Sequence, residues 1–116
     1  MTVSTFDANV RSQGSVATID LVGEINAFAE EALNQAYTEA EQYAPTHIVL
    51  NFTRVRYINS TGIALIVSLL ARTRKANRQL AVFGLSDHYQ EIFHITRLAD
   101  FVGIYPDETS ALSAAR

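Results

Sequence analysis

A polar turn that leads into a long apolar segment constrains the fold more than any other part of the chain. Residues 57–70 begin with Tyr-Ile-Asn-Ser-Thr-Gly and continue as an almost wholly apolar stretch. Directly before them, residues 47–52 (His-Ile-Val-Leu-Asn-Phe) are typical of a strand buried on both faces. The order strand, polar turn and buried helix indicates an open α/β sheet. In such a sheet Asn59, Ser60 and Thr61 would lie at the carboxyl-end rim, where ligands and partners bind.

Ser60 is placed to act as the N-cap of a helix that runs to about Asn77, or as its first residue. The first N–H groups of a helix lack partners inside it, and a serine oxygen can accept a hydrogen bond from one of them. A phosphate on the same oxygen would also be stabilised there by the helix dipole. The local chemistry therefore leaves two interpretations open: a helix cap alone, which is the commoner role, or a phosphorylation site.

Strand and helix patterns alternate along the rest of the chain. The predicted strands are Thr5–Asn9, Val16–Val22, His47–Phe52, Leu80–Gly84 and Phe101–Tyr105, with a turn at Ser12–Ser15 and a polar connection at Thr53–Arg56. Besides the helix at Ser60, the predicted helices are one capped by Asn26 and closed by Pro45, a short one capped by Ser86 or Asp87, and a terminal one from Pro106 and Asp107.

This order predicts one α/β domain over residues 1–116, with the arrangement β-β-α-β-α-β-α-β-α. Helices that alternate with apolar strands favour a central, mostly parallel β-sheet with about four helices, and the first two strands add an antiparallel edge hairpin. The apolar face expected for the helix at Ser60 consists of Ile63, Leu65, Ile66, Val67, Leu69 and Leu70.

Basic residues cluster where this helix ends, at Arg72, Arg74, Lys75 and Arg78. Two interpretations stay open for them. They form either a solvated helix end that complements the dipole, which is our preferred interpretation, or a patch that binds a partner.

The composition restricts the class of protein. The chain of 116 residues is 48% hydrophobic, which is enough for a core, and it contains no cysteine for a disulfide or a thiolate site. Its net charge of −3 disfavours direct binding to nucleic acid. Residues 1–5 do not resemble a signal peptide, and the apolar run at 63–67 is too short for a bilayer, so we expect a cytoplasmic protein without a membrane partner.

Enzyme motifs are absent from the sequence. It contains no Gly-x-Ser-x-Gly elbow, no phosphate-binding loop with Lys and Ser/Thr, and no Gly-x-Gly-x-x-Gly. His47, His88 and His94 lack the spacing of metal ligands. A response-regulator receiver would need an Asp at the end of its third strand, where this chain has Asn51-Phe52-Thr53. We therefore expect no catalytic residues, no cofactor and no metal site.

Residues 58–64 (Ile-Asn-Ser-Thr-Gly-Ile-Ala) resemble the phosphorylation loop of STAS domains of the anti-sigma factor antagonist type. The usual pattern there is an apolar residue, Asp, Ser, Ser or Thr, Gly, and an apolar helix. Residues 23–26 resemble the Gly-Glu/Asp-Leu-Asp turn of the family, and residues 91–98 and 107–112 resemble its last two helices. The resemblance covers essentially the whole chain, so it implies a single domain with the STAS fold.

The resemblance implies a binding protein that is switched by phosphorylation. The unmodified form would bind an anti-sigma factor with serine kinase activity and release a sigma factor, and a PP2C-type serine phosphatase would reverse the modification. Ser60 would be the phosphorylated residue, with Thr61 as the secondary candidate. The surface implied for partner binding consists of Gly23, Glu24, Asn26, Tyr57, Asn59, Ser60, Thr61 and Gly62. The alternatives are a constitutive scaffold module without phosphoswitching, or a domain that binds a small ligand or nucleotide.

Three residues depart from the family pattern. Asn26 and Asn59 stand where phosphorylated members have Asp, and Arg97 stands where the family often has Gly. Because an amide does not repel a phosphate, our hypothesis is that phosphate on Ser60 is better tolerated here. The rival hypothesis is that the kinase no longer recognises the loop and the domain binds its partner constitutively.

Overall fold

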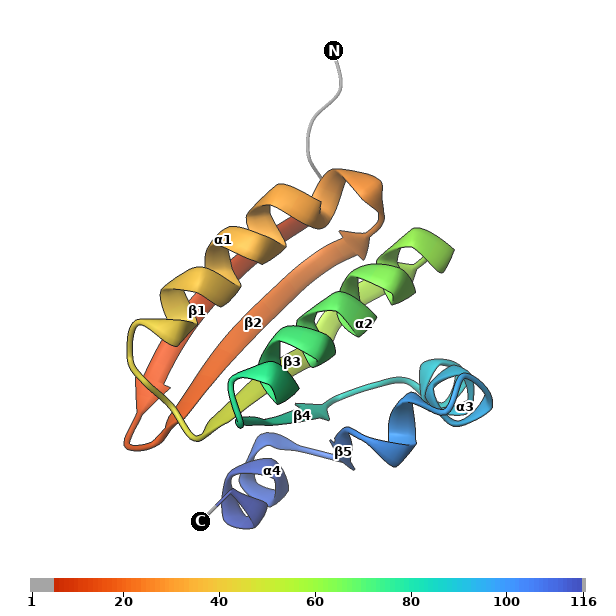
Figure 1. The fold of residues 1–116 in the computed structure, drawn as a ribbon. Coiled ribbons are helices and arrows are strands. Elements are labelled where there is room, and N and C mark those ends of the chain that lie inside the picture. The colour runs from red at the N-terminus through yellow and green to blue at the C-terminus, as the bar shows by residue number, and fades with distance from the viewer. Residues whose placement is uncertain (1–5, 116) are drawn as a thin grey trace.

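The computed structural model describes residues 6–115, and it contains one five-stranded sheet in the order β1-β2-β3-β4-β5 (Figure 1). The strands are β1 (Phe6–Gln13), β2 (Val16–Ile25), β3 (His47–Ile58), β4 (Gln79–Phe83) and β5 (Gly103–Tyr105). The helices are α1 (Glu30–Glu41), α2 (Ser60–Lys75), α3 (Asp87–Ile95) and α4 (Glu108–Ala114), with short 3-10 turns η1 (Ala27–Ala29) and η2 (Leu98–Asp100).

The predicted fold class is confirmed. β1 pairs with β2 antiparallel, and the three other pairings are parallel. The predictions for Met1–Thr5, including Thr5 as the first strand residue, concern residues outside the described range. Within residues 6–115, no helix combines the length and the apolar character needed to cross a bilayer.

Helices cover both faces of the sheet. Ile48, Leu50 and Phe52 of β3 belong to the larger core, which also holds the buried side chains of α1, α2 and α3. Val49, which points the other way from its neighbours, packs in a smaller core with Ala111 of α4. Figure 1 shows α1 and α2 side by side over the sheet, with α4 near its β5 edge. The alternation of side chains along buried strands thus serves two cores.

The central strands are longer than predicted, and the predicted polar connection Thr53–Arg56 is wrong because these residues belong to β3. β4 ends where Phe83 pairs with Asn51, so the later part of β3 pairs only with β2. Two register shifts interrupt that pairing, and Gly23 adopts a φ of 102° at one of them. A strand segment with one neighbour and exposed polar side chains looks like a loop in the sequence.

Other boundaries also differ from the prediction. Ser12 and Gln13 belong to β1, so the hairpin turn is confined to Gly14 and Ser15, and the last strand does not include Phe101 or Val102. Val67, expected on the packing face of α2, is 45% exposed.

Arg97 keeps the turn before η2 in the shape that glycine favours. Its φ is 67°, in the left-handed region, and its Nε donates to Asp100 Oδ2 at 2.7 Å. A residue with a Cβ is strained by roughly 1 kcal/mol or more there, so the substitution of Arg for Gly preserves the turn at a cost in stability.

A polar cluster joins α4 to the hairpin. Arg11 of β1 donates from Nε to Asp20 Oδ2 at 2.6 Å and from Nη1 to Glu108 Oε2 at 3.0 Å. Asn51 Nδ2 donates to Asp20 Oδ1 at 2.8 Å. Burial alone would raise the pKa of Asp20, but the hydrogen bonds from Arg11 and Asn51 and the charge of Arg11 outweigh it, so the pKa of Asp20 lies below its usual value.

The lowered pKa of Asp20 predicts a pH-dependent contribution to stability. Because the folded-state pKa is depressed, the contribution is present at neutral pH and is lost as the pH falls below the ordinary aspartate pKa of about 3.9. We expect Asp20→Asn to lower the free energy of unfolding at pH 7 by up to about 1 kcal/mol, and the difference from wild type to shrink below pH 4. Urea unfolding at several pH values measures this.

The matched control is Asp7→Asn, which also removes one negative charge from the hairpin. Asp7 lies on β1 and forms no ion pair among the described residues. A loss of stability in Asp20→Asn that stayed constant from pH 7 to pH 2.5 would contradict the prediction.

Candidate functional site

Ser60 is the first residue of α2, and its side chain is exposed. The residue that caps α2 is Asn59, whose Oδ1 accepts a hydrogen bond from the Gly62 N–H at 2.8 Å. The interpretation of Ser60 as the cap is therefore wrong, and the alternative placement as the first helical residue is confirmed. Within residues 6–115, no hydrogen bond involves the Ser60 hydroxyl, which leaves this oxygen open to solvent beside the first turn of a helix.

Main-chain contacts hold the loop before Ser60 against the end of β2. The Asn59 N–H donates to the Ile25 carbonyl oxygen at 3.2 Å, and the Ile63 N–H donates to the Asn59 carbonyl oxygen at 3.0 Å. Gly62 lies so close to Ile25 that a Cβ added to it would collide with the Ile25 carbonyl oxygen. The glycine in the motif is thus required by this close approach between α2 and β2.

Asn26 caps the turn that follows β2, as predicted. Its Oδ1 accepts a hydrogen bond from the Phe28 N–H at 3.0 Å, although the turn begins as the 3-10 segment η1 and only then continues into α1. Asn26 and Asn59 therefore each cap a helical segment by accepting a backbone N–H, one at the start of η1 and the other at the start of α2. An aspartate could make the same bond, so the two departures from the family pattern change the charge of the site and keep its capping geometry.

The structure brings the predicted surface residues together from two adjacent strand ends. Glu24 pairs with Tyr57, and Ile25 pairs with Ile58, across the parallel β2–β3 ladder. Tyr57 is 51% exposed, whereas Gly23 and Gly62 are buried and shape the backbone without presenting a side chain. The surface is therefore made by Glu24, Asn26, Tyr57, Asn59, Ser60 and Thr61.

The sequence analysis did not predict the exposure of two apolar residues. Phe28 is 78% exposed on η1, which contacts α2, and Val67 is exposed two turns after Ser60. The Asn26 cap could have placed Phe28 in the first turn after β2, because Asn26 Oδ1 accepts the Phe28 N–H. An exposed phenylalanine on a turn that contacts α2 is suited to binding a protein.

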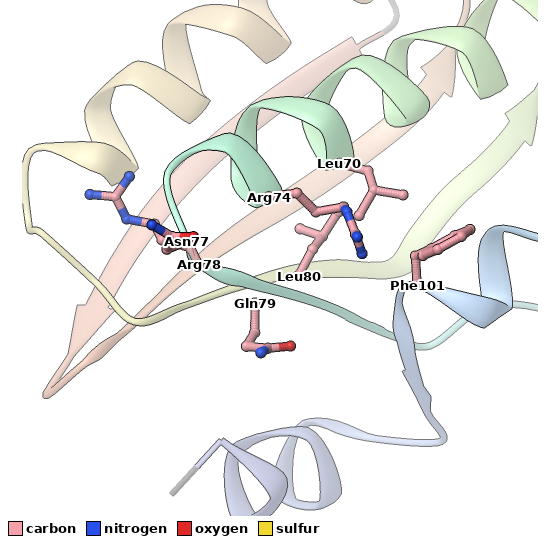
Figure 2. Close-up of a pocket in the computed structure, with 7 residues that line it drawn as sticks. All are labelled: Leu70, Arg74, Asn77, Arg78, Gln79, Leu80 and Phe101. Carbon is pink, nitrogen blue, oxygen red and sulfur yellow. The ribbon is translucent and has the colours of Figure 1, made fainter.

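A cavity of about 320 Å³ lies at the opposite end of α2 (Figure 2). It is lined by Leu70, Arg74, Asn77, Arg78, Gln79, Leu80 and Phe101. Figure 2 shows Arg74 extended toward Phe101, with its guanidinium carbon 4.9 Å from the ring centroid. The cavity therefore does not belong to the site at Ser60.

The basic residues at this end of α2 make contacts within the chain. Arg72 and Arg78 form ion pairs with Glu41 of α1 at 2.8 Å and 3.5 Å, and Arg78 Nε also donates to the Pro45 carbonyl oxygen. These contacts favour the interpretation of a helix end that complements the dipole. In the part of the chain that the structure describes, no group of three or more His, Cys, Asp or Glu side chains could hold a metal ion.

The assignment of the cap to Asn59 predicts different effects at adjacent positions. We expect Asn59→Ala to lower the free energy of unfolding by about 1 kcal/mol, because the Gly62 N–H loses its acceptor. Asn59→Asp keeps the acceptor and adds a charge that the helix dipole favours, so it should be at least as stable as wild type. Thermal and urea unfolding measure both.

Ser60→Ala is the matched control, and it should change the stability by less than about 0.5 kcal/mol, because the Ser60 hydroxyl caps nothing. A larger loss in Ser60→Ala than in Asn59→Ala would show that the serine is the true cap.

Known proteins match this fold and this sequence. The family model of the STAS domain matches residues 7–111. An anti-sigma-B factor antagonist of Listeria monocytogenes is 30% identical over 86 residues, which cover 74% of this chain and 75% of that protein.

Two solved structures share the fold. An anti-sigma factor antagonist from Mycobacterium paratuberculosis has a TM-score of 0.82 at 22% identity, covering 96% of this chain and 94% of that one. The Bacillus cell fate determinant SpoIIAA in its phosphorylated form has a TM-score of 0.73 at 21% identity, covering 94% of this chain and 99% of that one. The element order, the sheet and the match over residues 7–111 establish that this chain belongs to the STAS domain family.

Proposed function

We propose that this protein is an anti-sigma factor antagonist whose binding is switched by phosphorylation of Ser60. The observation that carries the proposal is the exposed, unbonded hydroxyl of Ser60 at the start of α2, where Asn59 already caps the helix. A kinase can reach this oxygen without first breaking a hydrogen bond within residues 6–115. The antagonists among its relatives support the same role.

In the unmodified state the surface around Ser60 docks an anti-sigma factor that is also a serine kinase, and the bound sigma factor is released. Phe28, two residues after the Asn26 cap, and Tyr57, two residues before the Asn59 cap, supply exposed aromatic area. Aromatic side chains of this kind contribute most of the binding energy in many interfaces. The polar loop supplies hydrogen-bonding groups from Asn59, Ser60 and Thr61.

Phosphorylation places about two negative charges on Ser60. The first-turn N–H groups of α2 and the uncharged Asn59 tolerate these charges, so the helix itself stays folded. The affinity for the docked partner falls, because binding would have to desolvate a charge that the interface does not neutralise. A serine phosphatase of the PP2C type removes the phosphate and restores binding. The protein is then the substrate of both enzymes and not an enzyme itself.

The second candidate function is a constitutive STAS module that binds its partner without switching. The observation that favours it is the pair of neutral caps, Asn26 and Asn59, where phosphorylated members of the family carry Asp. If the kinase reads those charges, their absence would leave Ser60 unmodified. The two candidates share the docking surface and differ only in whether Ser60 accepts phosphate.

Phosphorylation by the cognate kinase separates these candidates. We expect the kinase and ATP to add one phosphate to the wild-type protein. Mass spectrometry should map this phosphate to Ser60, and the Ser60→Ala variant should lack it. Thr61→Ala is the matched control and should still be modified. Asn59→Asp measures the effect of the missing charge, and a rate no higher than that of wild type would support tolerance of the neutral loop.

An unmodified wild-type protein, in a reaction where Asn59→Asp is phosphorylated, would favour the constitutive module.

Phe28 should be important for binding the partner but not for stability. Because it is 78% exposed, we expect Phe28→Ala to leave the unfolding midpoint nearly unchanged. Its affinity for the anti-sigma factor should fall about tenfold or more, the effect typical of an aromatic anchor. Phe101→Ala, at the far end of α2 and 52% exposed, is the control for a lost aromatic ring. Equal affinities for the two variants would place the interface elsewhere.

A further inference from the structure

The end of β3 that leads to Ser60 has no neighbouring strand on the side of β4. The ladder between these strands ends at the pair Asn51 and Phe83, and the chain then turns away toward α3 (Figure 1). Residues 52–58 of β3 continue past that point. Exposed backbone groups on that side of the strand can bind water, but the buried N–H of Ile58 needs a partner from the protein.

Two side chains of helix α3 contact this unpaired segment of β3. The rings of Phe93 and Phe52 meet edge to face with their centroids 6.2 Å apart. One end of the helix thus packs on the start of the unpaired segment, and Tyr89 lies at the other end of that segment. The Ile58 N–H, on the last residue of β3, donates to the Tyr89 hydroxyl oxygen at 2.8 Å.

This hydrogen bond is buried, since Tyr89 is 9% and Ile58 is 5% exposed. On the opposite side, the next N–H along the chain, that of Asn59, donates to the Ile25 carbonyl oxygen. Two consecutive N–H groups thus fix the chain from both sides, immediately before Ser60. One anchor is a main-chain bond to the last residue of β2, and the other is a single side-chain hydroxyl from α3.

We propose that Tyr89 is a positioning residue, which holds the Ser60 loop in the geometry that the kinase and the partner recognise. This inference rests on the proposed function of Ser60. Loss of the hydroxyl would leave the buried Ile58 N–H without an acceptor, which favours opening of the strand end. A loop that samples several positions must be ordered again on binding, so both docking and modification become weaker.

The chain offers a matched control for removing this hydroxyl. Tyr37 is also buried, and its hydroxyl contacts Thr73 Oγ1 at 2.6 Å, in the last turns of α2 and away from Ser60. Tyr89→Phe and Tyr37→Phe each delete one buried hydroxyl group. Only the first removes a contact to the Ser60 loop, so a difference between the variants reports on positioning and not on general stability.

Amide hydrogen exchange followed by NMR tests the anchor in the protein alone. In wild type we expect the Ile58 amide to exchange at least about a hundredfold more slowly than an unprotected amide. In Tyr89→Phe its exchange should accelerate between about fivefold and about 150-fold, the range expected for an unsatisfied buried N–H. In Tyr37→Phe the Ile58 rate should follow only the change in global stability.

The kinase supplies the second readout. Compared at equal amounts of folded protein, we expect kcat/KM for phosphorylation of Ser60 to fall severalfold in Tyr89→Phe and to stay near wild type in Tyr37→Phe. Equal values for the two variants would overturn the positioning role. An unprotected Ile58 amide in wild type would also overturn it, and that measurement needs no variant to fold.

Failure of the proposed function gives a different result. If an active kinase leaves wild-type Ser60 unmodified, the switch is wrong, and the role of Tyr89 in modification falls with it. The exchange experiment still decides whether the hydroxyl anchors the loop, and the partner affinities of the two variants then test positioning for docking.

Discussion

The candidate site depends on the close approach of the start of α2 to the end of β2. The Ile25 carbonyl oxygen accepts the Asn59 N–H and also lies against Gly62, which has no Cβ to keep the two segments apart. This contact places the first turn of a helix beside two parallel strand ends. Ser60, the first residue of that helix, is exposed there.

In the proposed switch, capping and modification fall on different residues. If Ser60 were the cap, its oxygen would hold the helix start, and phosphorylation would compete with that bond. Because Asn59 Oδ1 accepts the Gly62 N–H instead, a phosphate added to Ser60 would leave the cap in place. A switch of this kind changes the surface that a partner meets and leaves the fold intact, which suits a protein that acts by binding.

The neutral caps show how a family motif can change in charge without changing in shape. Asn26 and Asn59 each accept one N–H through Oδ1, a bond that an Asp would make equally well. In the proposed switch, this change of charge would act on kinase recognition and on the electric field around the phosphate. Arg97 behaves similarly, because it keeps a left-handed turn that Gly would adopt with less strain.

The sequence by itself determined the order of the elements, the antiparallel edge, the start of a helix at Ser60 and the Asn26 cap. These features depend on local periodicity and on the chemistry of a few neighbouring residues, which a single chain carries. The tertiary structure decided the rest. The choice of Asn59 over Ser60 as the cap follows from one residue's backbone angles, which the docking of α2 on β2 sets. The exposure of Phe28 and Val67 depends on which faces other elements cover. The bond from Ile58 to Tyr89 joins residues far apart in sequence, where β4 ends early and a side chain of α3 reaches the end of β3. No local pattern encodes such a contact, because it arises only when the whole sheet has formed.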